Sequence, residues 1–308
     1  MANHNYLHLV NQGLLGNIED KKKELTMLQR DLRIPTYKDH KNLQIEAVKH
    51  SVEIELVGCT KIRKHKLRRD NLKNLENALV WGSENYKDYI TEGLITHLAE
   101  LIEPNQNFGG YRYGEVRIKT QQGITHGTSP EKIENEMDYF LFENSCIETT
   151  PEQAIHAHLH TARIHPFFDG NGRTARLLQN IVLEKKGYFP VIIRNNERTK
   201  YIDLIAEAVR SYKKLAAETF TNENRAYQEL KAWLAHRQLS IEDLKRCRIL
   251  TLDLCKQTTS PDTSAFYDYI AQKILDAFNH EVYKVTEKIK MKKGYHSTRK
   301  SFKKKASH

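Results

Sequence analysis

The sequence predicts a mainly α-helical protein with one small β-hairpin, and two observations support that class. Apolar residues recur at helical intervals over most of the chain, whereas strand-like alternation is confined to residues 111–127. The 308 residues include 39% hydrophobic and 29% charged residues, a composition typical of a globular protein with a well-buried core. No apolar run approaches the ~20 residues that cross a bilayer, so we expect no membrane span.

The helical pattern divides into segments that are separated by turn residues. Pro35 and the polar residues after it interrupt the pattern early, and Pro130 starts a new helix with acids in its first turn. The basic stretch at 61–69 is interpreted as an exposed helix face. The predicted helices lie at residues 17–32, 41–56, 130–142, 152–164 and 174–186, with two more within 70–103, one around Tyr201 and a helical pattern over 223–290.

The alternating segment between these helices is the predicted hairpin. Val116, Ile118 and Thr120 alternate with polar residues, and Gly123 would supply the turn. Gly109 and Gly110 open this region and separate it from the helices before it. We therefore expect a two-stranded hairpin within residues 111–127.

The cysteine pattern and the N-terminus predict a cytoplasmic protein. Four cysteines are scattered along the chain without a C-x-x-C pair, as is typical of reduced thiols. The first residues lack the basic start and apolar core of a secretory signal. We therefore expect neither a disulfide scaffold nor a zinc structure built on cysteine.

From residue 284 onward the sequence is strongly basic. This tail holds ten Lys or Arg residues against one acid, so it carries most of the net charge of +10 and leaves the rest nearly neutral. A like-charge block at a chain end is more often a solvated segment than an arm for nucleic acid or acidic membranes. We therefore do not favour nucleic acid as a partner, although the tail keeps that alternative open.

Residues 165–176, H-P-F-F-D-G-N-G-R-T-A-R, are the segment that indicates chemistry. Gly170, Asn171 and Gly172 favour turn or left-handed backbone, so we expect a turn there with a helix starting directly after it. A glycine-rich turn that opens a helix points its free N–H groups outward. Together with the helix dipole, those N–H groups would form a site for phosphate.

Four titratable or charged side chains flank that turn. Arg173 and Arg176 lie three residues apart, share a helix face and could clamp a polyphosphate. Asp169 precedes the turn and could hold a magnesium ion that bridges phosphate oxygens. His165 ends the preceding helix and can take a proton from an attacking hydroxyl near neutral pH. This combination indicates phosphoryl or nucleotidyl transfer.

Two other interpretations of this region stay open on spacing alone. In the first alternative, the glycines only make the turn of an ordinary helix pair whose arginines face solvent. Metal-dependent hydrolysis is the second alternative, because four histidines cluster here; they are His156, His158, His160 and His165. The H-E-x-x-H pattern is absent and no acid stands where a water-activating Glu is needed, so we interpret most of these histidines as packing or surface residues.

The segment resembles the signature of the Fic (Fic/Doc) family, H-x-F-x-[D/E]-G-N-G-R-x-x-R, and matches it at every specified position. The residues at 158–164, 176–180 and 187–190 also resemble the family's flanking sequence. Gly110-Tyr111-Arg112 and the hairpin after them resemble the family's flap. The resemblance covers about residues 70–212 and is weak beyond them.

The resemblance implies a protein AMP-transferase that uses ATP together with Mg²⁺ or Mn²⁺. His165 would deprotonate the target hydroxyl, and Asp169 would hold the metal on the ATP phosphates. Arg173 and Arg176 would bind the β- and γ-phosphates. The hydroxyl would attack the α-phosphorus, and pyrophosphate would leave.

The resemblance also implies how the remaining parts of the nucleotide and the target are held. Gly170, Asn171 and Gly172 would line the anion hole. Tyr201 is a candidate adenine contact, with helix packing as the alternative. The 113–127 flap would pair with the backbone of a target protein as an added strand.

Residues Ser51 to Glu55 resemble the family's inhibitory helix, [S/T]-x-x-x-E-[G/N]. Leu56 departs from that pattern, because Gly or Asn is expected there, and this puts the ending of the helix and the aim of Glu55 in doubt. A carboxylate against Arg176 would occupy the γ-phosphate clamp and leave ATP misplaced for in-line attack. The alternative is an exposed helix on which Glu53 and Glu55 are solvated charges.

These segments divide the chain into four predicted regions. They are an N-terminal helical region at 1–69 with the candidate inhibitory helix at 41–60, a catalytic core at 70–212, a helical region at 213–283 and the basic tail at 284–308. The expected partner is a target protein, and a homodimer is a further alternative. Two other functions stay open: removal of AMP from a modified protein with Glu55 positioning water, and a nucleic-acid-associated regulator that uses the tail.

Overall fold

The computed structural model describes residues 9–32, 37–57, 60–120, 123–145, 147–219 and 263–305. Helices dominate these residues, so the predicted all-α class with a small hairpin is confirmed. The part of the 223–290 pattern that lies before residue 263 falls outside the described residues. The helices are α1 (Gln12–Leu32), α2 (Tyr37–Glu55), α3 (Lys61–Asn85), α4 (Glu92–Ile102), α5 (Ile133–Ser145), α6 (Thr150–Ile164), α7 (Asn171–Lys185), α8 (Arg198–Thr219) and α11 (Ser264–Lys305), with short 3-10 turns η1 (Pro130–Lys132) and η2 (Asn195–Glu197).

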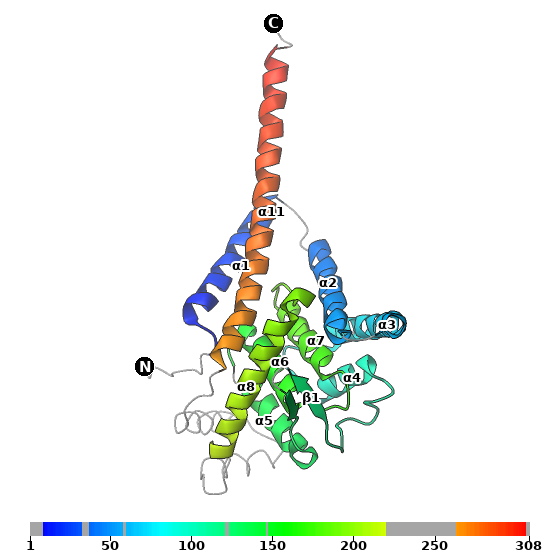
Figure 1. Ribbon diagram of the computed structural model, residues 1–308. Helices are drawn as coiled ribbons and strands as arrows, with labels where there is room; N and C mark the ends of the chain where they lie inside the picture. The colour runs from blue at the N-terminus through cyan, green and yellow to red at the C-terminus, as the bar shows by residue number, and fades with distance from the viewer. Residues whose placement is uncertain are drawn as a thin grey trace, which may run out of the picture.

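Helices α6 and α7 form the centre of the molecule, and nearly all of their residues are buried. Helix α7 packs against α2, α3 and α4, while α6 packs against α5, α8 and α11 (Figure 1). Burial of apolar side chains from both helices gives a core that fixes the connection between them. The 165–176 segment is that connection together with the first turns of α7.

The ends of this central pair follow from local sequence signals. Helix α6 begins where Thr149 Oγ1 accepts a hydrogen bond from the Glu152 N–H, and Pro151 lies in its first turn. Helix α7 begins at Asn171, three residues earlier than the sequence predicted. Gly170 makes the turn with φ 77°, and Asn171 and Gly172 already belong to the helix.

The predicted hairpin is present but shorter than expected. Strand β1 (Arg117–Thr120) pairs antiparallel with β2 (Gly123–His126), so Val116 lies before the strand and Gly123 is the first residue of β2. Among the described residues this is the only sheet, and each strand is an edge strand on its other side. A further strand can join a sheet only at such an outer edge.

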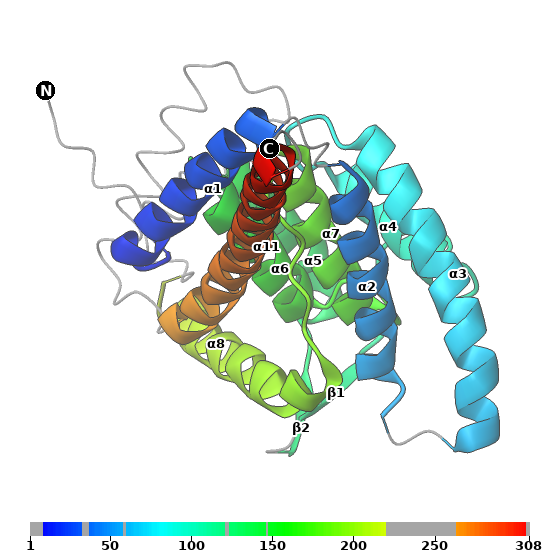
Figure 2. The same cartoon turned by 90° about the horizontal axis from the view of Figure 1, so that it is seen from above.

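Helices α1 and α11 pack together on the side of the molecule away from α3 (Figure 2). Helix α11 has 42 residues, which corresponds to roughly 60 Å at about 1.5 Å per residue. Its C-terminal part extends beyond the rest of the described chain (Figure 1). The basic residues from 284 to 305 therefore continue this helix.

The predicted division into regions stays a prediction, but helices cross all three of its boundaries. Helix α3 runs through the boundary at 69/70, α8 through the one at 212/213, and α11 through the one at 283/284. In the described part of the chain, no helix combines the length and the apolarity that a membrane crossing needs.

Candidate active site

His165 closes helix α6 in a left-handed conformation with φ 54°, which is uncommon for a residue other than glycine. Its Nδ1 lies 3.3 Å from the Ala162 carbonyl oxygen. Since that oxygen can only accept, Nδ1 carries the proton and Nε2 keeps a free lone pair. Burial lowers the pKa of His165, so the ring is neutral at neutral pH and can accept a proton at Nε2.

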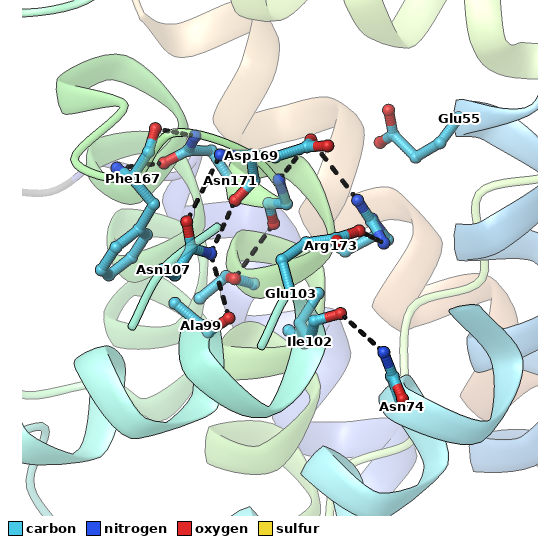
Figure 3. A network of polar contacts seen from close by, with 12 residues as sticks. Glu55, Asn74, Ala99, Ile102, Glu103, Asn107, Phe167, Asp169, Asn171 and Arg173 are labelled. Atoms are coloured by element: carbon cyan, nitrogen blue, oxygen red, sulfur yellow. Dashed lines mark hydrogen bonds and ion pairs between the residues drawn. The ribbon is translucent and has the colours of Figure 1, made fainter. Parts of the chain in front are cut away.

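Two buried asparagines shape the turn that follows. Asn171 bonds to the backbone of Phe167 in both directions, accepting from its N–H at 2.9 Å and donating to its carbonyl at 2.8 Å. Asn107 donates to the Asp169 carbonyl at 2.9 Å and to the Ala99 carbonyl at 3.0 Å (Figure 3). Since the amide oxygen and the amide nitrogen of Asn171 both bond to Phe167, this side chain holds the turn.

The start of α7 is open toward the site. Gly170 is the N-cap and has no side chain that could accept from the first N–H groups of the helix. A Cβ on Gly172 would lie 3.0 Å from Glu55 Oε1 and 3.1 Å from Arg176 Nη1, so glycine leaves room for a group beside the arginine. These features suit phosphate, because free helical N–H groups and the helix dipole both favour an anion there.

Arg173 is buried and faces two carboxylates. Its Nη1 lies 2.6 Å from Glu103 Oε1, and its Nη2 lies 3.5 Å from Asp169 Oδ1 (Figure 3). Its Nε makes no hydrogen bond in the described structure. An arginine that is 5% exposed and has an unused donor is suited to a further anion.

Asp169 is the acid of the turn, and its side chain is 62% exposed. Its Oδ1 accepts from the Gly170 N–H at 2.6 Å, which fixes the carboxylate at the entrance to the anion site. An exposed carboxylate next to a phosphate site is the oxygen donor that Mg²⁺ prefers. The residues present therefore fit the metal that the sequence analysis expected.

Arg176 binds helix α2 with three hydrogen bonds. Its Nε donates to Ser51 Oγ at 2.8 Å, and its Nη2 donates to the Ser51 carbonyl at 3.1 Å and to Glu55 Oε1 at 2.7 Å. Burial would raise the pKa of Glu55, but the charge and hydrogen bond of Arg176 outweigh it and lower that pKa. The pair that the sequence analysis placed together is thus in contact, with Glu55 ionised and 39% exposed.

Helix α2 ends at Glu55 despite Leu56. The Leu56 side chain is 2% exposed and joins the core, and its N–H donates to the Glu53 carbonyl at 3.3 Å. Arg198 Nε caps the Ile54 carbonyl at 2.9 Å. Burial of Leu56 and the hydrogen bond from Arg198 therefore end helix α2 in place of the expected glycine or asparagine. Glu53 is paired as well, with Arg68 on α3 at 2.7 Å, so neither acid is simply solvated.

Tyr201 is buried, and its hydroxyl contacts two protein side chains. Its side chain is 1% exposed, and its hydroxyl contacts Arg176 Nη1 at 3.2 Å and His158 Nε2 at 2.8 Å. A side chain buried to this degree agrees with the helix-packing alternative, and the adenine contact stays a prediction. These hydrogen bonds could not be predicted from the sequence, because the three residues come from three different helices.

Arg112 joins the hairpin region to the turn after α6, and it is a residue whose contacts the sequence did not reveal. Its Nε donates to the His165 carbonyl at 2.7 Å, its Nη1 to the Gly114 carbonyl at 2.7 Å, and its Nη2 to the Thr128 carbonyl. Its backbone N–H donates to the Pro166 carbonyl at 2.9 Å. The flap base is therefore fixed to the backbone of His165 itself.

The other histidines of α6 are packed inside the protein. His156 and His160 stack with ring centroids 4.0 Å apart, and with Glu143 from α5 they form a group that could hold a metal ion. However, donors of Asn144 and Arg163 face the Nδ1 atoms of His156 and His160 at 3.3 and 3.4 Å. Such donors favour protons on both Nε2 atoms, so the contacts agree with packing residues.

Comparison with known proteins identifies the central part of the chain. Residues 89–183 match the model of the Fic/DOC family. The protein adenylyltransferase Fic of Nematostella vectensis is 28% identical over 220 residues, which cover 65% of this chain and 51% of that protein. The protein adenylyltransferase Fic of Culex quinquefasciatus is 30% identical over 209 residues, which cover 61% of this chain and 42% of that protein. The chain thus spans about half the length of the curated relatives it matches.

Solved structures share the fold at low sequence identity. A Fic domain-containing signaling protein from Bacteroides thetaiotaomicron superposes with a TM-score of 0.56 at 19% identity, covering 88% of this chain and 97% of that one. The Fic-1 protein of C. elegans gives a TM-score of 0.54 at 19% identity, covering 90% of this chain and 73% of that one. The complete 165–176 signature lies within residues 89–183, which match the model of the Fic/DOC family, and the helical fold agrees with that match.

Proposed function

We propose that the protein transfers AMP from ATP to a hydroxyl group of a target protein. One observation carries the proposal: a neutral histidine, an open helix N-terminus and two buried arginines converge within residues 165–176. The curated relatives, which are named protein adenylyltransferases, support the same activity.

His165 acts as the general base. Its Nε2 accepts the proton of the target hydroxyl while Nδ1 stays bonded to the Ala162 carbonyl. The hydroxyl oxygen then attacks the α-phosphorus of ATP, the bond to the bridging oxygen breaks, and pyrophosphate leaves. The first N–H groups of α7 and the arginines stabilise the phosphate charge during this step.

Asp169 and the two arginines bind and orient the triphosphate. Asp169 would hold Mg²⁺ or Mn²⁺, which neutralises phosphate charge when bound. Arg173 binds the β-phosphate through its unused Nε, and Arg176 binds the γ-phosphate once its contacts with α2 are released. Both arginines are buried, so they act where water screens charge least.

Helix α2 inhibits this reaction in the described conformation. Glu55 and Ser51 occupy the edge of Arg176 that the γ-phosphate needs. ATP that cannot reach Arg176 would bind with its α-phosphorus turned away from the hydroxyl. Inhibition therefore rests on competition between a carboxylate and a phosphate for one guanidinium.

The hairpin selects the target segment. Strands β1 and β2 form a two-stranded sheet whose outer edges can accept an added strand. Arg112 fixes the base of the hairpin to the His165 backbone. An extended target segment bound to that edge would therefore bring its hydroxyl near His165.

The proposal is tested by incubating the Glu55→Gly protein and a lysate with ATP labelled at the α- or the γ-phosphate. We expect protein to be labelled only from the α position, and only with Mg²⁺ or Mn²⁺ present. Transfer of the γ label would instead show a kinase. Loss of label from pre-modified protein on addition of the wild-type chain would favour the reverse activity, in which Glu55 orients a water molecule.

A further inference from the structure

The four hydrogen bonds of the Arg176 guanidinium fall into two sets. Three of them reach helix α2: Nε to Ser51 Oγ at 2.8 Å, Nη2 to the Ser51 carbonyl at 3.1 Å and Nη2 to Glu55 at 2.7 Å. The fourth runs from Nη1 to the Tyr201 hydroxyl on α8 at 3.2 Å. The first set uses Nε and Nη2, which lie on one edge of the planar group, and the fourth hydrogen bond uses Nη1.

The Tyr201 hydroxyl belongs to a buried chain of hydrogen bonds with a defined direction. His158 Nδ1 lies 2.7 Å from Gln179 Oε1, while the amide nitrogen of Gln179 lies 3.4 Å from Asn180 Oδ1. This arrangement puts the histidine proton on Nδ1 and leaves Nε2 as an acceptor. Nε2 therefore accepts the Tyr201 O–H at 2.8 Å, and the lone pairs of the hydroxyl face Arg176.

Burial keeps this chain in place. Tyr201, His158 and Gln179 are each at most 1% exposed, and Phe266 of α11 lies edge-on to the His158 ring with centroids 5.4 Å apart. Burial also lowers the pKa of His158 to about 3, so the ring stays neutral and continues to accept the tyrosine proton. By contrast, Glu55 is 39% exposed and sits on the last turn of α2.

The two sets of hydrogen bonds therefore respond differently when α2 moves away. Release of α2 would free Nε and Nη2, which form the fork that binds a phosphate with two parallel hydrogen bonds. The Nη1 contact does not involve α2 and would remain. A guanidinium fixed at one nitrogen loses less rotational freedom on binding phosphate than one that is unanchored.

We propose that Tyr201, oriented by His158, is a positioning residue that keeps Arg176 aimed at the terminal phosphate of ATP after Glu55 leaves. This inference rests on the proposed function. Tyr201 touches Arg176 and not the nucleotide, so its loss should weaken ligands that reach Arg176 and spare ligands that do not. ATP and AMP differ in this respect, because AMP has no γ-phosphate.

The test uses the Glu55→Gly chain as parent and adds Tyr201→Phe, which removes only the hydroxyl. We expect the calorimetric Kd of ATP to rise about tenfold, the change that about 1.4 kcal/mol produces, while the Kd of AMP stays within about twofold. Tyr188→Phe is the matched control, because Tyr188 is also buried but bonds Glu19 on α1. Its ATP affinity should equal that of the parent.

A second pair of variants covers the case in which Tyr201→Phe fails to fold. His158→Gln supplies an amide oxygen that can accept the tyrosine O–H, and His158→Leu does not. We expect His158→Gln to preserve the ATP-to-AMP affinity ratio and His158→Leu to lower it. Equal ratios in both variants would overturn the proposal, as would a folded Tyr201→Phe protein that binds ATP as tightly as its parent or weakens both nucleotides alike. A parent that binds no ATP would contradict the proposed function itself before any of these variants is compared.

Discussion

Neutralising Glu55 should release the nucleotide site, and the structure gives the size of the effect. The Glu55→Gln change keeps the side-chain shape but removes the charge that faces Arg176 at 2.7 Å. Because the Glu55 side chain is 39% exposed, solvent screens its charge. We therefore take the interaction free energy of the Glu55–Arg176 ion pair as about 1 kcal/mol. That free energy corresponds to about a fivefold larger fraction of molecules with Arg176 free for phosphate.

The assay is the initial rate of self-labelling from α-labelled ATP at a concentration below its KM. We expect about fivefold faster labelling for Glu55→Gln and at least that for Glu55→Gly, which also removes the hydrogen bond. Glu53→Gln is the matched control, since Glu53 lies on the same helix but pairs with Arg68. Its rate should equal that of the wild type.

Two results would contradict the predicted competition between Glu55 and phosphate. A folded Glu55→Gln protein with unchanged labelling would mean that the carboxylate does not compete with phosphate for Arg176. An equal gain in Glu53→Gln would mean that loosening of α2 as a whole, and not the Glu55 charge, controls the rate. In addition, Arg176→Ala in the Glu55→Gly background should abolish the gain, because the clamp itself is then missing.

Three further predictions concern the reaction. His165→Ala should lower transfer by about 10²–10⁴-fold and leave the Kd of ATP nearly unchanged, measured by labelling and calorimetry, because His165 acts on the hydroxyl proton. The transfer rate should fall only as the pH drops below about 6.5, the ordinary pKa of histidine, because the base must be neutral and burial lowers the pKa of His165 below that value. A transfer rate that already falls with decreasing pH above pH 7 would contradict this prediction. Asp169→Ala should give the same low labelling as chelation of divalent metal, and undiminished labelling would exclude Asp169 as a metal ligand.

The parts of the site that could be predicted from the sequence are the local ones. The signature at 165–176 places its residues within a few residues of one another, so glycine preference and helix geometry constrain their arrangement. The hairpin and most helices could be predicted from periodicity for the same reason. The start of α7 was placed three residues too late, because Asn171 bonds back to Phe167 and is compatible with the first turn of a helix.

The rest depends on contacts between segments far apart in the chain. Asn107 holds the Asp169 backbone across 62 residues, and no local pattern marks either partner of that pair. The hydrogen bonds of Tyr201 could not be predicted for the same reason, since its partners lie on other helices. Leu56 also shows that packing can override a motif, because burial in the core gives the helix ending that a glycine or asparagine would otherwise supply.

AMP transfer by His165 can be measured from the intact mass of the purified Glu55→Gly protein after incubation with ATP and Mg²⁺, beside the same protein carrying His165→Ala. We expect the first protein to gain the mass of one or more AMP groups, whereas the second gains none and still binds ATP. A gain of phosphate mass, or an equal AMP gain in both proteins, would contradict AMP transfer by His165.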